Sequence, residues 1–215
     1  MEPAGDCSFN ADKVLIDSLK SLPEQPLDVN VNTSTGILQV IHSTGEIKVH
    51  VTADDYPKMK DDDENELSFS LSAGVLRRGL QKNQKQMAND ELRPVMNGIY
   101  FDITPDSIVF AASDGHRLSK FVDNSVKGLE KQGFILNRNA VPVLIKMLSP
   151  MADDEAIDVK VNKRNIIVLI ENVTYTIRLI EGRYPNYNSV IPQSNPIEMI
   201  IHRDAVSSVL SRLLI

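Results

Sequence analysis

The chain contains 215 residues, of which 42% are hydrophobic and 24% are charged, and its formal net charge is −6. These values are typical of an ordinary globular protein with one or two domains, and the acidic balance argues against a general polyanion binder. No window approaches about 18 uncharged apolar residues, so no segment is predicted to span a membrane.

Four stretches have the apolar spacing of amphipathic helices. They are Ala11–Leu22, Ala73–Asn89, Arg138–Leu148 and Ala205–Leu213. Pro142 falls in the first turn of the third stretch, where a missing backbone N–H has little effect on a helix. The stretches are separated by long intervals, which leaves room for several strands between consecutive helices.

Short runs in those intervals alternate apolar and polar residues, with the period of a strand that is buried on one face. They are Ile47–Val51, Ile99–Ile103, Ser107–Ala112, Phe134–Leu136, Ile157–Val161, Asn165–Ile170 and Tyr175–Leu179. Turn-forming residues such as Gly45 and Asn162-Lys163 separate neighbouring runs. Because short strands outnumber helices, the sequence predicts an α+β class in which antiparallel sheets carry helices on one face.

The chain also resembles itself at a spacing of about 130 residues, which is the pattern of tandem repeats. The helix Ala11–Leu22 and the pair Tyr56-Pro57 recur as Arg138–Leu148 and Tyr184-Pro185. A second echo links residues 66–69 and Ala73 with residues 198–201 and Ala205. We therefore predict repeated domains, with the charged run at residues 60–66 as a linker and a second boundary near residues 194–196.

No familiar catalytic or metal-binding signature is present, and we predict no catalytic residue, metal site or cofactor. The single cysteine, Cys7, excludes an internal disulfide and a cysteine-based zinc cage, and it fits a reducing cytoplasm. One segment, Ser113–Arg117, places a hydroxyl, a carboxylate, an imidazole and a guanidinium together. It has two interpretations: an active site, or a tight turn in which Asp114-Gly115 reverses the chain.

Three blocks of sequence carry a resemblance to a known family. They are Arg93–Phe101, Ala112–Ser119 and Glu181–Pro192. In this order and spacing they resemble the middle domain of the bacterial DNA polymerase III sliding clamp. The resemblance implies that residues 1–60 are the C-terminal half of a first clamp domain, residues 66–194 a complete central domain and residues 197–215 the beginning of a third. The chain is therefore expected to be an internal fragment.

The resemblance also implies a function and partners. Clamps of this family are homodimeric rings with helices lining the hole, and this chain alone is expected to be monomeric. The expected partners are duplex DNA, bound without regard to sequence, and DNA polymerase III and the clamp loader, bound through short linear peptides. The chain is then a cytoplasmic processivity factor and not an enzyme, because the polymerase activity belongs to its partners.

Two of the predicted helices are basic in an otherwise acidic chain. Their cations are Arg77, Arg78, Lys82, Lys85, Arg138 and Lys146. Arg78, Lys82 and Lys85 share one helix face, and Leu76 and Leu80 lie on another. A solvated basic face is one interpretation. Given the resemblance, we predict instead that these residues face DNA and contact its phosphates.

The resemblance places a partner-peptide pocket on the three matching blocks. Its expected residues are Met96, Ser113, Gly115, His116, Arg117, Leu118, Pro185 and Val190. Apolar walls, an adaptable methionine and a glycine that allows close backbone approach suit a peptide anchor. The alternative is structural, with Leu118 and Val190 in the core and Pro185 ending a strand.

The chain departs from the family pattern in two places. The family completes its cleft with residues near the end of the third domain, which this sequence does not include. Pro94 and Val95 stand where relatives often have DNA-facing aromatic residues, so a DNA contact there is not expected. Two other functions remain open: an enzyme that uses Asp114 and His116, and a repeat-built scaffold that binds proteins but not DNA.

Overall fold

A computed structural model describes residues 8–52, 67–127 and 129–213. The chain divides into two units, residues 1–60 and 61–215, which we call the smaller and the larger unit. The pair Tyr56-Pro57, Cys7 and the predicted linker at residues 60–66 lie outside the described residues. No helix among the described residues is long and apolar enough to cross a membrane.

The smaller unit is one antiparallel sheet with a helix against it. Its elements are β1 (Asn10–Ala11), α1 (Lys13–Lys20), β2 (Asp28–Asn32), β3 (Ile37–His42) and β4 (Gly45–Thr52), with sheet order β1-β4-β3-β2. Leu38, Val40 and Val51 are buried, and Leu15 and Leu19 of α1 pack against them.

The predicted helix Ala11–Leu22 is too long at its start. Asn10 and Ala11 pair with β4 instead, and the Asp12 side chain caps the first turn. Tertiary pairing therefore overrides the local helical pattern at this end.

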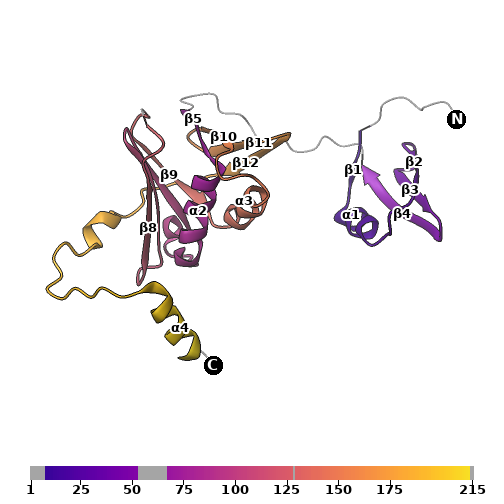
Figure 1. Ribbon diagram of the computed structural model, residues 1–215. Helices are drawn as coiled ribbons and strands as arrows, with labels where there is room; N and C mark the ends of the chain where they lie inside the picture. The colour runs from indigo at the N-terminus through magenta and orange to yellow at the C-terminus, as the bar shows by residue number, and fades with distance from the viewer. Residues whose placement is uncertain (1–7, 53–66, 128, 214–215) are drawn as a thin grey trace. The chain divides into compact units, whose positions relative to one another are not determined.

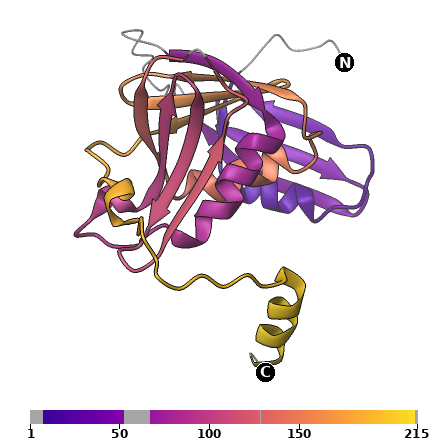
Figure 2. The ribbon, with the colours of Figure 1, turned by 60° about the vertical axis from the view of Figure 1, so that its left-hand side comes forward.

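The larger unit contains two four-stranded antiparallel sheets (Figure 2). One has the order β8-β7-β6-β9, with β6 (Gly98–Thr104), β7 (Ser107–Ser113), β8 (Leu118–Asp123) and β9 (Gln132–Asn137). The other has the order β12-β11-β10-β5, with β5 (Leu67–Ser72), β10 (Ala156–Val161), β11 (Asn165–Ile170) and β12 (Val173–Arg178). The seven predicted strands are confirmed to within two residues at each end.

Two helices, α2 (Ala73–Asn83) and α3 (Ala140–Leu148), lie side by side and cover the core of the larger unit (Figure 1). Val75, Leu76 and Leu80 of α2 and Leu144 and Leu148 of α3 are buried against both sheets. This arrangement confirms the predicted α+β class with helices on one face. The last helix, α4 (Arg203–Leu213), has no buried residue.

The order strand, helix, three strands occurs three times along the chain. It runs from β1 to β4, from β5 through α2 to β8, and from β9 through α3 to β12. Within the larger unit the two copies exchange strands, because β5 pairs with β10 and β9 pairs with β6. The larger unit is therefore a pseudo-symmetric pair of repeats. This pair recurs at a shorter spacing than the self-resemblance of about 130 residues, so the predicted tandem domains stay a prediction.

The predicted helix Ala73–Asn89 is wrong at its end. The α-helix stops at Asn83, whose side-chain amide donates to the carbonyl of Gly79 at 2.8 Å. A single 3₁₀ turn (η1, Gln84–Gln86) follows, and Met87 is extended. Side-chain bonding to the preceding turn competes with helix propagation. The third predicted helix likewise begins at Ala140 and not at Arg138, because β9 continues to Asn137.

A glycine in α2 provides a test of this packing. A Cβ on Gly79 would lie 2.6 Å from a ring carbon of Phe110 in β7. We expect Gly79→Ala to destabilise the larger unit by about 1–3 kcal/mol, although alanine favours helices, because the helix would have to move off the sheet. Urea unfolding measures this change. Gln81→Ala, on the exposed side of α2, is the control and should change the free energy of unfolding by less than about 0.5 kcal/mol.

Candidate functional site

The segment Ser113–Arg117 is the turn between β7 and β8. Gly115 has a φ of 91°, a left-handed conformation that favours glycine. The Asp114 carboxylate accepts hydrogen bonds from the backbone N–H of His116 at 2.9 Å and of Arg117 at 2.8 Å. Its second oxygen accepts from the Arg117 guanidinium at 2.7 Å. The carboxylate thus organises a turn, as the second interpretation of this segment predicted.

Hydrogen bonds from Arg117, backbone first and side chain second, together with the His116 N–H, hold the pKa of the Asp114 carboxyl well below its usual range. A carboxylate with so low a pKa is a poor proton acceptor near neutral pH. The geometry therefore favours a binding role for this segment over general acid–base catalysis.

A hollow of about 320 Å³ lies beside this turn, and we call it the partner pocket. Its walls come from η2 (Pro94–Met96), from the β7–β8 turn and from the chain after β12, which includes η3 (Tyr187–Val190). The structure brings all eight predicted pocket residues together here: Met96, Ser113, Gly115, His116, Arg117, Leu118, Pro185 and Val190. Three further residues, Tyr184, Asn186 and Tyr187, complete the wall.

The partner pocket offers an accessible apolar surface. Val190 is 67% exposed, and Leu118 is half-buried beside a small core cluster, so neither is a fully buried core residue. Met96 is buried at the base. Arg117 and His116 are exposed at the edge, where they can orient a polar group of a ligand.

Met96 is held in place by a network around Asn97. The Asn97 side chain accepts from the N–H of Asp90 and donates to its carbonyl, each at 2.9 Å. The N–H of Ala88 donates to the carbonyl of Met96 at 3.0 Å. These bonds fix the loop between η1 and η2, so this wall of the pocket is preorganised.

Three tyrosines support the opposite wall. Tyr100 of β6 stacks on Tyr184 with ring centroids 4.9 Å apart and meets Tyr187 edge-on at 6.2 Å. The Tyr187 hydroxyl donates to Asp102 at 2.8 Å. Burial, and then this bond to Asp102, raise the pKa of Tyr187 far above its usual range, so its hydroxyl remains a donor. Val95 packs on the same cluster and is a structural residue here.

The predicted DNA-facing cations divide into two groups. Arg77 is mostly buried, forms an ion pair with Asp153 and donates to the carbonyls of Leu148 and Met151. Arg138 donates to the carbonyl of Ala88 at 2.8 Å. Both side chains are therefore engaged within the protein.

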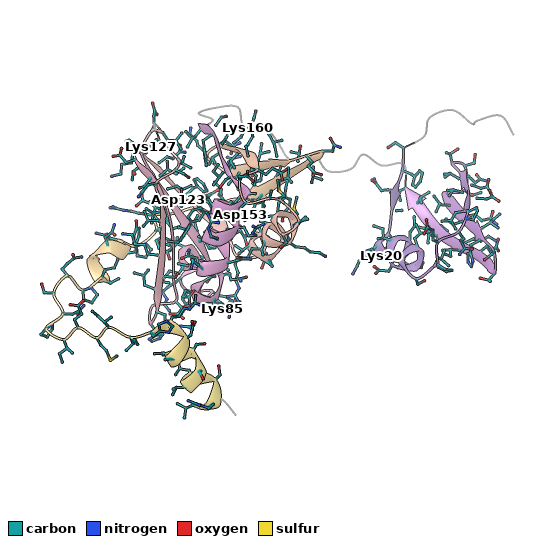
Figure 3. All side chains as sticks on the ribbon, in the orientation of Figure 1. Lys20, Lys85, Asp123, Lys127, Asp153 and Lys160 are labelled. Atoms are coloured by element: carbon teal, nitrogen blue, oxygen red, sulfur yellow. The ribbon has the colours of Figure 1, made fainter. Side chains whose placement is uncertain are left out.

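The other cations are more available. Lys82, Lys85 and Lys146 are exposed and form no ion pair with a described carboxylate. Arg78 is 44% exposed and also pairs with Asp153, at 3.0 Å. Asp153 and Lys85 are labelled in Figure 3, with Lys85 just past the end of α2. Arg78, Lys82, Lys85 and Lys146 are thus the candidates for phosphate contacts.

No cluster of three or more potential metal ligands occurs among the described residues. The candidate surfaces of the described residues are a pocket with apolar walls and a set of exposed lysines on and after the two helices. Both are suited to binding.

Comparisons with known proteins give a consistent result. The sequence profile of the DNA polymerase III beta subunit, central domain, matches residues 70–186. The beta sliding clamp of Haemophilus influenzae is 32% identical over 142 residues, which is 66% of this chain and 38% of the relative. The beta sliding clamp of Rickettsia bellii is 26% identical over 206 residues, which is 94% of this chain and 54% of the relative.

Solved structures share the fold. The DNA polymerase III subunit beta of Pseudomonas aeruginosa superposes with a TM-score of 0.75 at 24% identity, covering 85% of this chain and 50% of that one. A structure of the sliding clamp from the same organism bound to griselimycin also has a TM-score of 0.75, at 24% identity over 86% of this chain and 49% of that one. The chain spans about half the length of these structures.

The low pKa of Asp114 leads to a test of the β7–β8 turn. A carboxyl whose pKa is lowered by folding stabilises the fold above its ordinary pKa, and this contribution disappears only as the pH falls through the lowered value. We therefore expect the amide resonances of His116 and Arg117 to keep their positions from about pH 5 to about pH 3.5, where an ordinary aspartate is largely protonated.

The control is Asp114→Asn, which removes the charge and should shift both resonances at every pH. It should also accelerate hydrogen exchange at these amides. A titration of the wild-type resonances with a midpoint near pH 4 would show that the carboxylate does not hold the turn.

Proposed function

The chain belongs to the DNA polymerase III beta subunit family, and on that premise we propose that it acts as a sliding clamp, a processivity factor that encircles duplex DNA and tethers the replicase to it. The observation that carries the proposal is the convergence of the eight predicted residues around one partner pocket. These residues come from three separated segments of sequence. Polymerase chemistry belongs to the partners, and the clamp contributes binding alone.

The partner pocket is the proposed docking site for short linear peptides of DNA polymerase III and the clamp loader. An apolar anchor side chain would contact Met96, Leu118 and Val190 and would be removed from water. The preorganised walls favour this step, since little conformational entropy is lost on binding. Arg117 and His116 at the edge would orient a polar group of the peptide.

The proposed DNA surface consists of Arg78, Lys82, Lys85 and Lys146. Lysine contacts with phosphates are independent of base sequence and exchange readily, which allows movement along the duplex. The acidic remainder of the chain would discourage DNA from other faces. We also propose the family's assembly and domain plan: a cytoplasmic homodimeric ring, with residues 1–60, 66–194 and 197–215 as parts of three successive clamp domains.

The peptide site can be tested at Leu118. Burying an apolar anchor contributes about 1.5–3 kcal/mol, so Leu118→Asp should weaken binding of a peptide with an apolar anchor by roughly tenfold or more. Isothermal titration calorimetry measures the affinity, and circular dichroism checks that the fold is intact. Val122→Asp, which is 45% exposed on the same strand outside the pocket, is the matched control. Equal affinities of the two variants would place the peptide elsewhere.

The DNA surface can be tested through its dependence on salt. Each lost phosphate contact should reduce the slope of log affinity against log salt concentration by about 0.9. The triple variant Lys82→Gln, Lys85→Gln, Lys146→Gln should therefore flatten the slope by nearly three. Fluorescence anisotropy with duplexes of unrelated sequence measures this.

Two control variants separate DNA binding from structure. Lys160→Gln, on β10, should leave the slope unchanged. Arg77→Gln removes hydrogen bonds to two carbonyls and the pair with Asp153, and should mainly lower the free energy of unfolding, by about 1–3 kcal/mol. A slope unchanged in the triple variant would support the protein-binding scaffold instead of the clamp.

A further inference from the structure

A second hollow, of about 280 Å³, adjoins the partner pocket, and we call it the basic hollow. Its own lining residues are Tyr100, Asp102, Lys131, Arg183 and Asn188. Residues 184–187 line both hollows and form a wall common to them. A peptide bound in the partner pocket can therefore extend over residues 184–187 into the basic hollow.

The two hollows differ in chemistry. The partner pocket is lined by the aliphatic side chains of Met96, Leu118 and Val190. The basic hollow has no such side chain, and its walls are tyrosines, asparagines, one proline and three charged residues. The first hollow suits an apolar anchor, whereas the second suits a polar or charged group.

The charge of the basic hollow is positive. Lys131 and Arg183 are exposed and form no ion pair with a described carboxylate. A third cation, Lys120, stands beside them, with its ammonium 5.4 Å from the centroid of the Tyr187 ring and 3.1 Å from the Asn188 side-chain oxygen. The hollow is thus lined by two cations and one carboxylate, and a third cation contacts two of its lining residues.

That carboxylate, Asp102, is already engaged. One of its oxygens accepts the hydrogen bond from the Tyr187 hydroxyl, and the Tyr187 ring packs against Tyr100. Tyr100 stacks in turn on Tyr184 of the common wall. The three tyrosines thus form a packed aromatic base for the hollow, and Arg183 directly precedes one of them, Tyr184.

We propose that the basic hollow binds acidic side chains that lie next to the apolar anchor of a partner peptide. The two hollows then bind consecutive parts of one peptide. The partner pocket buries the apolar anchor, and the basic hollow attracts the acidic side chains next to it. Arginine is suited to this role because its guanidinium can bind a carboxylate through two hydrogen bonds. The inference rests on the proposed peptide-binding function and adds a specificity element to it.

The experiment uses labelled synthetic peptides and the 215-residue chain. Each peptide carries a pair of leucines as the anchor, with Glu-Glu or Gln-Gln placed either before or after it. Fluorescence anisotropy at low salt gives the affinities. We expect one of the two Glu-Glu peptides to bind about three- to tenfold more tightly than its Gln-Gln counterpart, which is the range for two exposed charge contacts. Salt should reduce this advantage.

Variants of the chain then locate the effect. Lys131→Gln with Arg183→Gln should abolish the preference for Glu-Glu while leaving the affinity for the Gln-Gln peptides unchanged. Arg183→Gln alone should lose part of the preference. Lys160→Gln removes one positive charge from β10, outside both hollows, and should retain the full preference (Figure 3).

The outcomes separate this inference from the proposed function. If the peptides bind and Leu118→Asp weakens them, but Glu-Glu and Gln-Gln peptides bind equally, the basic hollow has no such role and the peptide pocket stands. A preference for Glu-Glu that survives in the double variant also overturns the inference. If no peptide binds and Leu118→Asp changes nothing, both the inference and the proposed peptide site are wrong.

Discussion

The exchange of strands between the two repeats is the constraint on which the larger unit depends. β5 of the first repeat pairs with β10 of the second along its whole length, with Leu67 opposite Val161 at one end and Ser72 opposite Ala156 at the other. In the same way, β9 of the second repeat pairs with β6 of the first. Each sheet of the larger unit thus takes its fourth strand from the other repeat, and α2 and α3 share one core that contains residues of both repeats. A bridge between Ile135 and Ile180 then leads the chain after β12 across β9 and toward the partner pocket.

The periodicity of the sequence identified some strands that are buried on one side and missed others, since β3 and β5 also alternate buried residues with more exposed ones and were not among the predicted runs. β10 alternates buried and exposed residues along its whole length, and β11 is a nearly continuous apolar run. The apolar pattern did not predict β8, whose sequence after the Asp114-Gly115 turn has no clear alternation. It also placed the end of α2 too late. There the helix stops because the Asn83 side chain bonds to the turn before it, and the following residues, Met87 and Ala88, are held by the loop. The apolar spacing of the sequence gives no sign of contacts that end a helix in this way.

The candidate site was predictable in part for a similar reason. The resemblance supplied eight residues of the partner pocket, but composition and spacing gave no reason to add Tyr184 and Tyr187, whose role depends on stacking with Tyr100 from a distant strand. The basic residues show the opposite error. Arg77 was predicted to face DNA because it lies on a basic helix, whereas its partners, Leu148, Met151 and Asp153, lie more than 70 residues away in the sequence. The helical pattern shows which residues share a face of the helix, but it does not show that the loop after α3 binds the Arg77 side chain.

Asp153 connects the packing of the helices with the proposed DNA surface. Its backbone carbonyl accepts from the N–H of Gly74, and its carboxylate binds Arg77 and Arg78, so it holds the first turns of α2 against the loop after α3. This use of the arginines leaves the proposed phosphate contacts mainly to Lys82, Lys85 and Lys146. Lysine is a flexible point charge without the two-pronged geometry of arginine. On the proposed function, a surface built in this way would attract the DNA backbone without fixing a register on it, which is the property that a ring moving along duplex DNA would require.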